Sequence, residues 1–330
     1  MTTVALEDTR HAARAEEIAG RLAALHGTDA ARLTFRAWIP RSARKQCRRL
    51  FVQSSVDGTP LHVAKVPLDP DDAMVAREWS VLTSLDDLGL PRPHPVAELD
   101  SGFVMSYVPA RDFPDVMRAT PPQGWPGLLG SALELAATVR SSGGGEVPGD
   151  PVETAAGYLP GLTGVTEPTL RYLERAAVGP SHGDLGPWNL RVADDGRIGL
   201  IDWEDHRAVG VPALDALNVV WTAALLAFPD YGEHGFDWLY DRVFHEDNAF
   251  RAAADHALCR YTALTGDDVD DLVGLTPLIC RWMIRRIEDQ GRPAGHLFYG
   301  PFADRFEAEN PRWTSRTSQS SQSSRTGRSS

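Results

Sequence analysis

Two stretches of this chain, SHGDLGPWN at 181–189 and IDWE at 201–204, decide its fold. The first carries Asp184 five residues before Asn189, on a segment that its glycines and proline mark as a loop. The second carries Asp202 directly after a short apolar run. Two carboxylates and a carboxamide therefore follow one another in an order that a short hairpin can gather.

The sequence predicts a β-hairpin between Asn189 and Asp202. The apolar runs 190–192 and 198–201 flank Asp195-Gly196, a dipeptide typical of two-residue type I′ turns. Asn189 and Asp202 are equally distant from that turn, so we expect them to face each other with Cβ atoms about 5 Å apart. Two oxygen ligands in this position suit Mg²⁺, which prefers hard oxygen donors and keeps other positions for water and phosphate.

This arrangement predicts phosphoryl transfer. Asp184 can reach a substrate hydroxyl beside the metal, which is what transfer from a nucleotide requires. A His-Gly-Asp tripeptide or an Asp-Gly hairpin alone is an ordinary structural turn. The prediction therefore depends on Asp184, Asn189 and Asp202 occurring together and in this order.

These segments resemble the catalytic loop and the metal-binding segment of the aminoglycoside phosphotransferase and choline kinase-like family, which has the two-lobed protein-kinase fold. The resemblance implies an α+β chain with a small antiparallel β lobe, containing one helix, and a larger, mainly helical lobe. It implies that Asp184 is the catalytic aspartate, which orients the acceptor hydroxyl and accepts its proton. Asn189 and Asp202 would hold Mg²⁺, Glu204 would assist a second ion, and Asp215 would brace the loop.

A nucleotide-binding lobe should precede these segments, and residues 61–66 (LHVAKV) read as one of its strands. The strand follows a predicted turn at Asp57-Gly58. Strand alternation places Leu61, Val63 and Lys65 on one face, so a lysine shares the apolar side.

A helix is predicted over about 71–88, opened by Asp69-Pro70 as its cap and first-turn proline. The neighbours of Glu78 three and four residues away are all apolar, which puts a carboxylate on the buried stripe. Because a buried carboxylate is costly unless it is paired, we expect Glu78 to bind Lys65. The alternative to this pair is that Glu78 is a solvated helix residue and Lys65 a snorkelling residue of an edge strand. The pair matches the kinase pairing in which the lysine reaches the α- and β-phosphates.

Residues 102–109 (GFVMSYVP) resemble the strand and hinge that follow in such kinases. The resemblance implies that backbone groups from Met105 through Tyr107 to Val108 meet the edge of the adenine ring.

The chain departs from the kinase pattern between 33–38 and 50–52, where no Gly-x-Gly-x-x-Gly occurs. Residues 39–49 read IPRSARKQCRR instead. Without glycines the backbone has less freedom to wrap phosphates. Either the basic side chains supply charge to the phosphates or the segment is an ordinary solvated turn. ATP is the expected donor, and GTP is not excluded.

Four regions are predicted: a helix packing on the small lobe (1–32), the nucleotide-binding lobe (33–108), the catalytic and acceptor-binding lobe (109–313) and a disordered Ser/Thr/Arg-rich tail (314–330). In the first region, Ile18, Leu22 and Leu25 are expected on one helix face. Helices of the larger lobe are expected at 128–140, 168–177, 214–227, 238–244, 249–264 and 269–288.

Composition narrows the class of partner. A formal net charge of −12 over 330 residues argues against nucleic acid. It is compatible with a cationic acceptor, although a solvated acidic surface explains it equally well. Three cysteines without metal-ligand spacing and an N-terminus without an apolar run favour the cytoplasm. The longest apolar stretch, about 219–228, is too short to span a bilayer.

The predicted function is Mg²⁺-dependent transfer of the γ-phosphoryl group of ATP to a hydroxyl of a small molecule, such as an amino sugar, an amino alcohol or a related metabolite. Asp205 and His206 are the best-placed acceptor-binding candidates. A nucleotide-binding pseudokinase or scaffold is the alternative. A protein kinase is disfavoured, because Gly183 stands where those enzymes usually carry arginine and no Ala-Pro-Glu element follows.

Overall fold

The computed structural model describes residues 4–6, 11–27, 30–40, 49–85, 88–142, 147–291 and 293–313. The predicted tail at 314–330 and the part of the basic stretch at 41–48 lie outside the described residues. The chain divides into two compact units. The first comprises Met1–Ala110, Ala193–Asp195 and Gly199–Asp205, and the second comprises Arg111–Val192, Gly196–Ile198 and His206–Ser330.

A six-stranded sheet forms the centre of the first unit, in the order β1-β2-β3-β4-β6-β5. The strands are β1 (Val4–Leu6), β2 (Leu33–Trp38), β3 (Arg49–Val56), β4 (Thr59–Pro67), β5 (Pro95–Glu98) and β6 (Phe103–Ser106). All neighbours pair antiparallel except β1 and β2, which are parallel. The predicted turn at Asp57-Gly58 is confirmed, since both residues have positive φ, 50° and 80°, as a type I′ turn requires.

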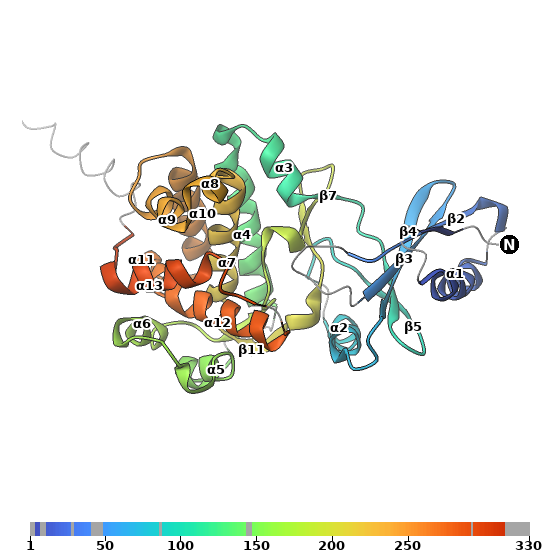
Figure 1. The fold of residues 1–330 in the computed structure, drawn as a ribbon, viewed down its shortest axis with the longest axis horizontal. Coiled ribbons are helices and arrows are strands. Elements are labelled where there is room, and N and C mark those ends of the chain that lie inside the picture. The colour runs from blue at the N-terminus through green and yellow to red at the C-terminus, as the bar shows by residue number, and fades with distance from the viewer. Residues whose placement is uncertain are drawn as a thin grey trace, which may run out of the picture. The chain divides into compact units, whose positions relative to one another are not determined.

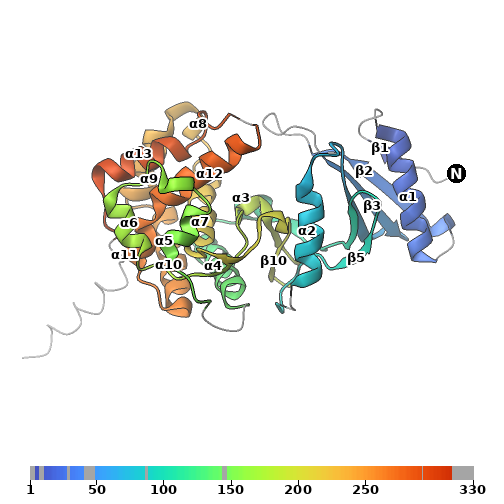
Figure 2. The same ribbon diagram turned by 90° about the horizontal axis from the view of Figure 1, so that it is seen from below.

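Helices cover both faces of this sheet (Figure 2). On one face, α1 (Ala12–His26) buries Ala15, Ile18, Ala19 and Leu22 against strand residues that include Leu50, Val52 and Ala64. On the other face, α2 (Ala73–Ser84) buries Val75, Glu78 and Leu82. Strand alternation explains both contacts, because Ala64 and Val66 of β4 turn to α1 while Lys65 turns to α2.

Three expectations about the first unit are wrong in detail. Leu25 is 45% exposed and Leu61 is 40% exposed, so neither belongs to the buried face on which it was placed. The cap of α2 is Asp72, whose side chain accepts the Met74 N–H at 3.1 Å. Asp69 instead accepts the Asp71 N–H at 3.0 Å, within its own turn, so the helix begins about one turn later than predicted.

The second unit is mainly helical (Figure 1). Its helices are α3 (Phe113–Ala119), α4 (Trp125–Ser141), α5 (Pro151–Ala156), α6 (Glu167–Leu173), α7 (Ala213–Ala227), α8 (Tyr231–His234), α9 (Phe236–Phe244), α10 (Ala249–Thr265), α11 (Val269–Gly274), α12 (Thr276–Asp289) and α13 (Tyr299–Glu309). Helix α4 packs along α10, and α12 packs along α13.

The predicted helix at 269–288 is in fact two helices, α11 and α12. A Cβ at Gly274 would lie 2.3 Å from the ring of Tyr172, so this close approach requires glycine. Pro277 follows in the first turn of α12, where its missing N–H costs nothing.

Two small sheets complete the fold. Strand β9 (Leu190–Val192) lies between β10 (Ile198–Leu200) and β7 (Arg111–Asp112), and β11 (Arg207–Gly210) pairs antiparallel with β8 (Gly179–Ser181).

The predicted neighbours β9 and β10 are confirmed, but their turn is not of type I′. Gly196 has a φ of 82°, whereas Asp195 is absent from the non-glycine residues of positive φ in the described chain. Five residues, 193–197, connect the strands, so the turn does not impose the predicted register.

Among the helices that the structure describes, none is both long and apolar enough to cross a bilayer.

Candidate active site

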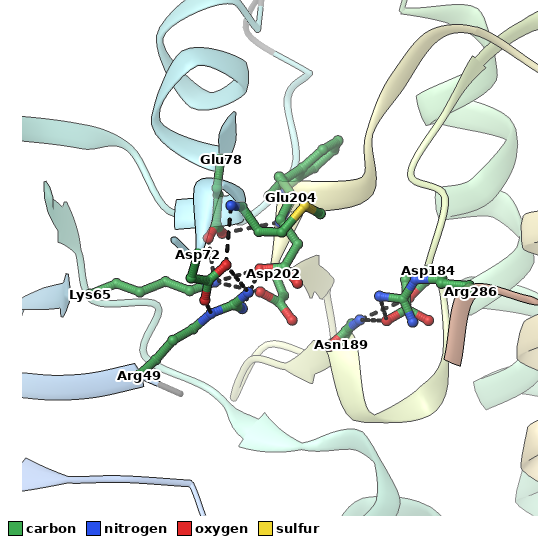
Figure 3. Close-up of polar contacts among 11 residues, drawn as sticks. Arg49, Lys65, Asp72, Glu78, Asp184, Asn189, Asp202, Glu204 and Arg286 are labelled. Carbon is green, nitrogen blue, oxygen red and sulfur yellow. Dashed lines mark hydrogen bonds and ion pairs between the residues drawn. The ribbon is translucent and has the colours of Figure 1, made fainter. Parts of the chain in front are cut away.

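Lys65 lies at the centre of a group of buried charges in the first unit (Figure 3). Its Nζ pairs with Glu78, with Asp202 Oδ1 at 2.6 Å and with Glu204 Oε2 at 3.2 Å. Lys65 is 2% exposed and Glu78 is 1% exposed. The predicted pairing of the strand lysine with the helix glutamate is therefore present, with two further carboxylates on the same ammonium.

The segment that carries Asp202 is held against α2 by backbone as well as by side chains. The other oxygen of Glu78, Oε1, accepts the N–H of Trp203 at 3.1 Å. Asp202 itself has a φ of 67°, a left-handed conformation that is rare for residues other than glycine. Such a conformation costs of order 1–3 kcal/mol and persists where the surroundings hold it, which here are Lys65 and the Glu78–Trp203 hydrogen bond.

Arg49, the last residue of the basic stretch and the first of β3, joins this group. Its guanidinium pairs with Glu204 and, through Nε, with Asp72 Oδ2 at 2.9 Å. We call Arg49, Lys65, Asp72, Glu78, Asp202 and Glu204 the lysine cluster. Four carboxylates face two cations within it, so the cluster has an excess of two negative charges when all six groups are ionised.

The electrostatics follow from burial and this excess. Burial raises the pKa of Glu78 to about 7, in spite of the neighbouring Lys65 ammonium. Burial, together with Asp202, also raises the pKa of Glu204. Burial alone would lower the pKa of Lys65, but the surrounding carboxylates, Asp202 first, raise it. One oxygen each from Glu78, Asp202 and Glu204 lies within 4.8 Å of the others, a set of hard donors that fits a divalent cation.

In the second unit, Asp184 is held by Asn189 and Arg286 (Figure 3). Asn189 Nδ2 donates to the backbone oxygen of Asp184 at 2.8 Å and to its Oδ2 at 3.4 Å. Arg286 of α12 pairs with the same Oδ2 at 3.0 Å. All three residues are buried. Because Asn189 uses its nitrogen on Asp184, its carboxamide oxygen is the atom suited to a cation.

Asp215, in the first turn of α7, braces the loop as the resemblance implies. Its carboxylate accepts the N–H groups of His182 at 2.5 Å and Gly183 at 3.0 Å. Gly183 has a φ of 84°, which glycine adopts without strain. Burial raises the pKa of Asp215 to about 7, against the lowering effect of these hydrogen bonds.

The predicted hinge residues lie at and beyond the end of β6. Met105 lies within the sheet, opposite Val63 of β4 and Pro95 of β5. The N–H of Tyr107 donates to Leu61 O at 2.7 Å, so this donor is already used inside the sheet. Of the three, Val108 is the one whose backbone N–H has no partner in the described chain.

The structure thus brings Lys65, Glu78, Asp202 and Glu204 together in one unit, and Asp184 and Asn189 in the other. The pairing of Asn189 with Asp202 concerns residues of different units and stays a prediction.

Sequence reasoning missed Arg49 and Arg286 as individual residues. Arg286 carries only half of the signal that Glu78 does, because Trp282 and Met283 on the preceding helical turn are apolar while Asp289 and Gln290 on the following turn are polar. Arg49 is one of several basic residues in the stretch 39–49, and the sequence does not show which of them lies at the start of a strand.

No known family profile and no curated protein sequence matches the chain. Several solved structures match the chain. Choline kinase LicA from Streptococcus pneumoniae matches with a TM-score of 0.51 at 16% identity, covering 89% of this chain and 97% of that one. An ethanolamine kinase of Plasmodium vivax matches with a TM-score of 0.47 at 12% identity, covering 84% and 80%. The streptomycin–ATP complex of aminoglycoside phosphotransferase APH(2")-IIa matches with a TM-score of 0.47 at 14% identity, covering 82% and 88%.

At 16% identity the likeness to choline kinase LicA establishes the fold alone. The chain has the α+β, protein-kinase-like fold of choline kinase LicA, and the predicted fold class is confirmed.

Proposed function

We propose that this protein is a small-molecule kinase of the aminoglycoside phosphotransferase and choline kinase-like family, which transfers the γ-phosphoryl group of ATP to an alcohol. The observation that carries the proposal is the buried Lys65–Glu78 pair, whose ammonium also meets Asp202 and Glu204. Apolar residues of similar volume would serve stability as well as a buried ion network does, so such a network is typical of a functional site. The likeness of the fold to that of a choline kinase supports the same reading.

The first unit would bind the nucleotide. Lys65, positioned by Glu78, would neutralise oxygens of the α- and β-phosphates. Arg49 would add a second cation beside it, in place of the backbone N–H groups that a glycine-rich loop supplies elsewhere. The N–H of Val108 would meet the adenine edge, because the N–H of Tyr107 is used by Leu61.

Mg²⁺ fits the donors present. Asp202 and Glu204 would hold it, joined by Asn189 as the sequence predicts, and the excess of two negative charges in the lysine cluster favours a divalent ion. When bound, Mg²⁺ offsets the negative charge of the phosphate oxygens during transfer.

The second unit would bind the acceptor. The acceptor oxygen forms a bond to the γ-phosphorus while the bond from that phosphorus to the β,γ-bridging oxygen breaks, and ADP leaves. The hydroxyl proton passes to the carboxylate of Asp184. Asn189 and Arg286 hold this carboxylate in place.

A direct test is ADP release from ATP and Mg²⁺ across a panel of amino sugars, amino alcohols, sugars and nucleosides, with the phosphoester identified by ³¹P NMR. Asp184→Asn should reduce turnover by about 10³-fold or more while Mg-ATP binding, measured by calorimetry, persists. Asp230→Asn, at an exposed carboxylate in the same unit, is the matched control. Mg-ATP binding without transfer to any acceptor would instead identify a pseudokinase, and failure to bind Mg-ATP would contradict both readings.

A further inference from the structure

Arg207 of β11 carries a guanidinium group that the fold does not satisfy. The group lies 4.2 Å from the centre of the Tyr158 ring and 5.4 Å from that of the Trp282 ring. Its Nε is buried and has no hydrogen-bond acceptor, and no carboxylate in the described part of the chain pairs with Arg207. Ring faces attract the positive charge, but they do not accept the N–H bonds in the guanidinium plane. A buried donor without an acceptor is costly, which indicates that a ligand supplies one.

The position of Arg207 ties it to the proposed acceptor site. Arg207 is paired with Ser181 of β8, three residues before Asp184. Trp282, against which the Arg207 guanidinium lies, is four residues of α12 before Arg286, an axial rise of about 6 Å. Arg286 in turn pairs with Asp184 at 3.0 Å. Trp282 therefore connects the Arg207 guanidinium to the helix that carries Arg286, the partner of the proposed catalytic aspartate.

Two acidic side chains of the second unit that could favour a cationic acceptor pair with arginines instead. Asp241 pairs with Arg305 at 2.5 Å, and Asp289 pairs with Arg285 at 2.9 Å. Asp184 itself pairs with Arg286, and arginine binds carboxylate and phosphate groups through paired N–H bonds.

We propose that the acceptor alcohol carries an anionic group, a carboxylate or a phosphate, and that Arg207 binds this group while the hydroxyl meets Asp184. The proposal rests on the proposed kinase function and specifies its substrate class, in place of the cationic acceptor that the sequence suggested.

The test compares alcohols that differ in one charged group: gluconate with glucose for a carboxylate, and glycerol 3-phosphate with glycerol for a phosphate. Choline and ethanolamine provide cationic alcohols. We expect kcat/KM for at least one anionic member to exceed that of its neutral partner by about tenfold or more, the range of one charged hydrogen-bonded contact. A higher kcat/KM for gluconate than for glucose would indicate a carboxylate, and a higher kcat/KM for glycerol 3-phosphate than for glycerol would indicate a phosphate.

Arg207→Gln should reduce this ratio by about tenfold or more, mainly through KM. Arg171→Gln, at an exposed arginine of α6, should leave it unchanged. Circular dichroism and thermal unfolding check that both variants fold. If Arg207→Gln lowers the melting temperature but leaves the ratio unchanged, the role of Arg207 is structural and the proposal is wrong.

The outcomes separate the two proposals. Phosphorylation of neutral or cationic alcohols without any gain from the anion overturns the acceptor class but leaves the kinase function standing. If no alcohol is phosphorylated, calorimetry with gluconate and glycerol 3-phosphate in the presence of Mg-ADP decides. Binding that Arg207→Gln abolishes supports the anion site, and no binding to the wild-type protein overturns it.

Discussion

The ion pair between Arg286 and Asp184 should contribute measurably to the stability of the second unit. Its side chains are 10% and 11% exposed, and the atoms are 3.0 Å apart. Coulomb's law with an effective dielectric constant of about 20 gives an attraction of about 5 kcal/mol, before the cost of removing both charges from water. Arg286→Met removes the attraction and leaves the buried carboxylate, a change that usually costs about 3–5 kcal/mol. Because Asn189 still donates to Asp184 at 3.4 Å, we expect the lower end, about 3 kcal/mol.

The assay is a double-mutant cycle with Arg286→Met, Asp184→Asn and the double variant, measured by urea unfolding. The double variant leaves no buried charge, so it should be more stable than the two single changes together predict, with a coupling energy of about 2 kcal/mol. Arg171→Met, at an exposed position in the same unit, should change the free energy of unfolding by less than about 0.5 kcal/mol. Additive effects of the two single variants would refute the reasoning.

Other predictions concern the lysine cluster and the thiols. Lys65→Met should lower kcat/KM for ATP by about 100-fold or more, whereas Arg49→Gln should raise KM for ATP by about tenfold, both measured by ADP release. The folded-state pKa of Glu78, about 7, exceeds its ordinary value of 4.5. Its contribution to stability is therefore complete below pH 4.5 and lost as the pH rises through 7, so in metal-free buffer Glu78→Gln should gain on the wild-type protein from pH 5 to pH 8 by up to about 3 kcal/mol. The absence of any gain between pH 5 and pH 8 would show that Lys65 keeps Glu78 ionised throughout this range. Burial raises the pKa of the Cys280 thiol, so iodoacetamide at pH 8 should label the partly exposed Cys259 before Cys280, as mass spectrometry would show.

Local rules predicted the main elements because they act within a few residues. The turn at Asp57-Gly58 needs only its own dihedral preferences, and the burial of Glu78 follows from the apolar residues one turn away on α2. The predicted partner of Glu78 followed because a buried carboxylate needs a cation. For Arg286 the local signal is weaker, because only its neighbours on the preceding turn, Trp282 and Met283, are apolar.

What the sequence did not reveal depends on contacts between distant segments. The glycine at the end of α11 is required by the ring of Tyr172, about a hundred residues earlier than Gly274. The partners of Arg49 are Asp72 and Glu204, which no local pattern connects. The hairpin turn after β9 is longer than Asp195-Gly196 suggests, since five residues, 193–197, connect the strands and Asp195 does not have the positive φ of a type I′ turn.

One carboxylate in the first unit, that of Asp72, has two structural roles. Asp72 closes the amino end of α2 through the Met74 N–H and also receives the Arg49 guanidinium. A ligand that draws the Arg49 guanidinium away from Asp72 would therefore change the contacts of the residue that caps the helix carrying Glu78. A ligand bound to Arg49 at the beginning of β3 would in this way act, through the Asp72 side chain, on the helix whose Glu78 positions Lys65.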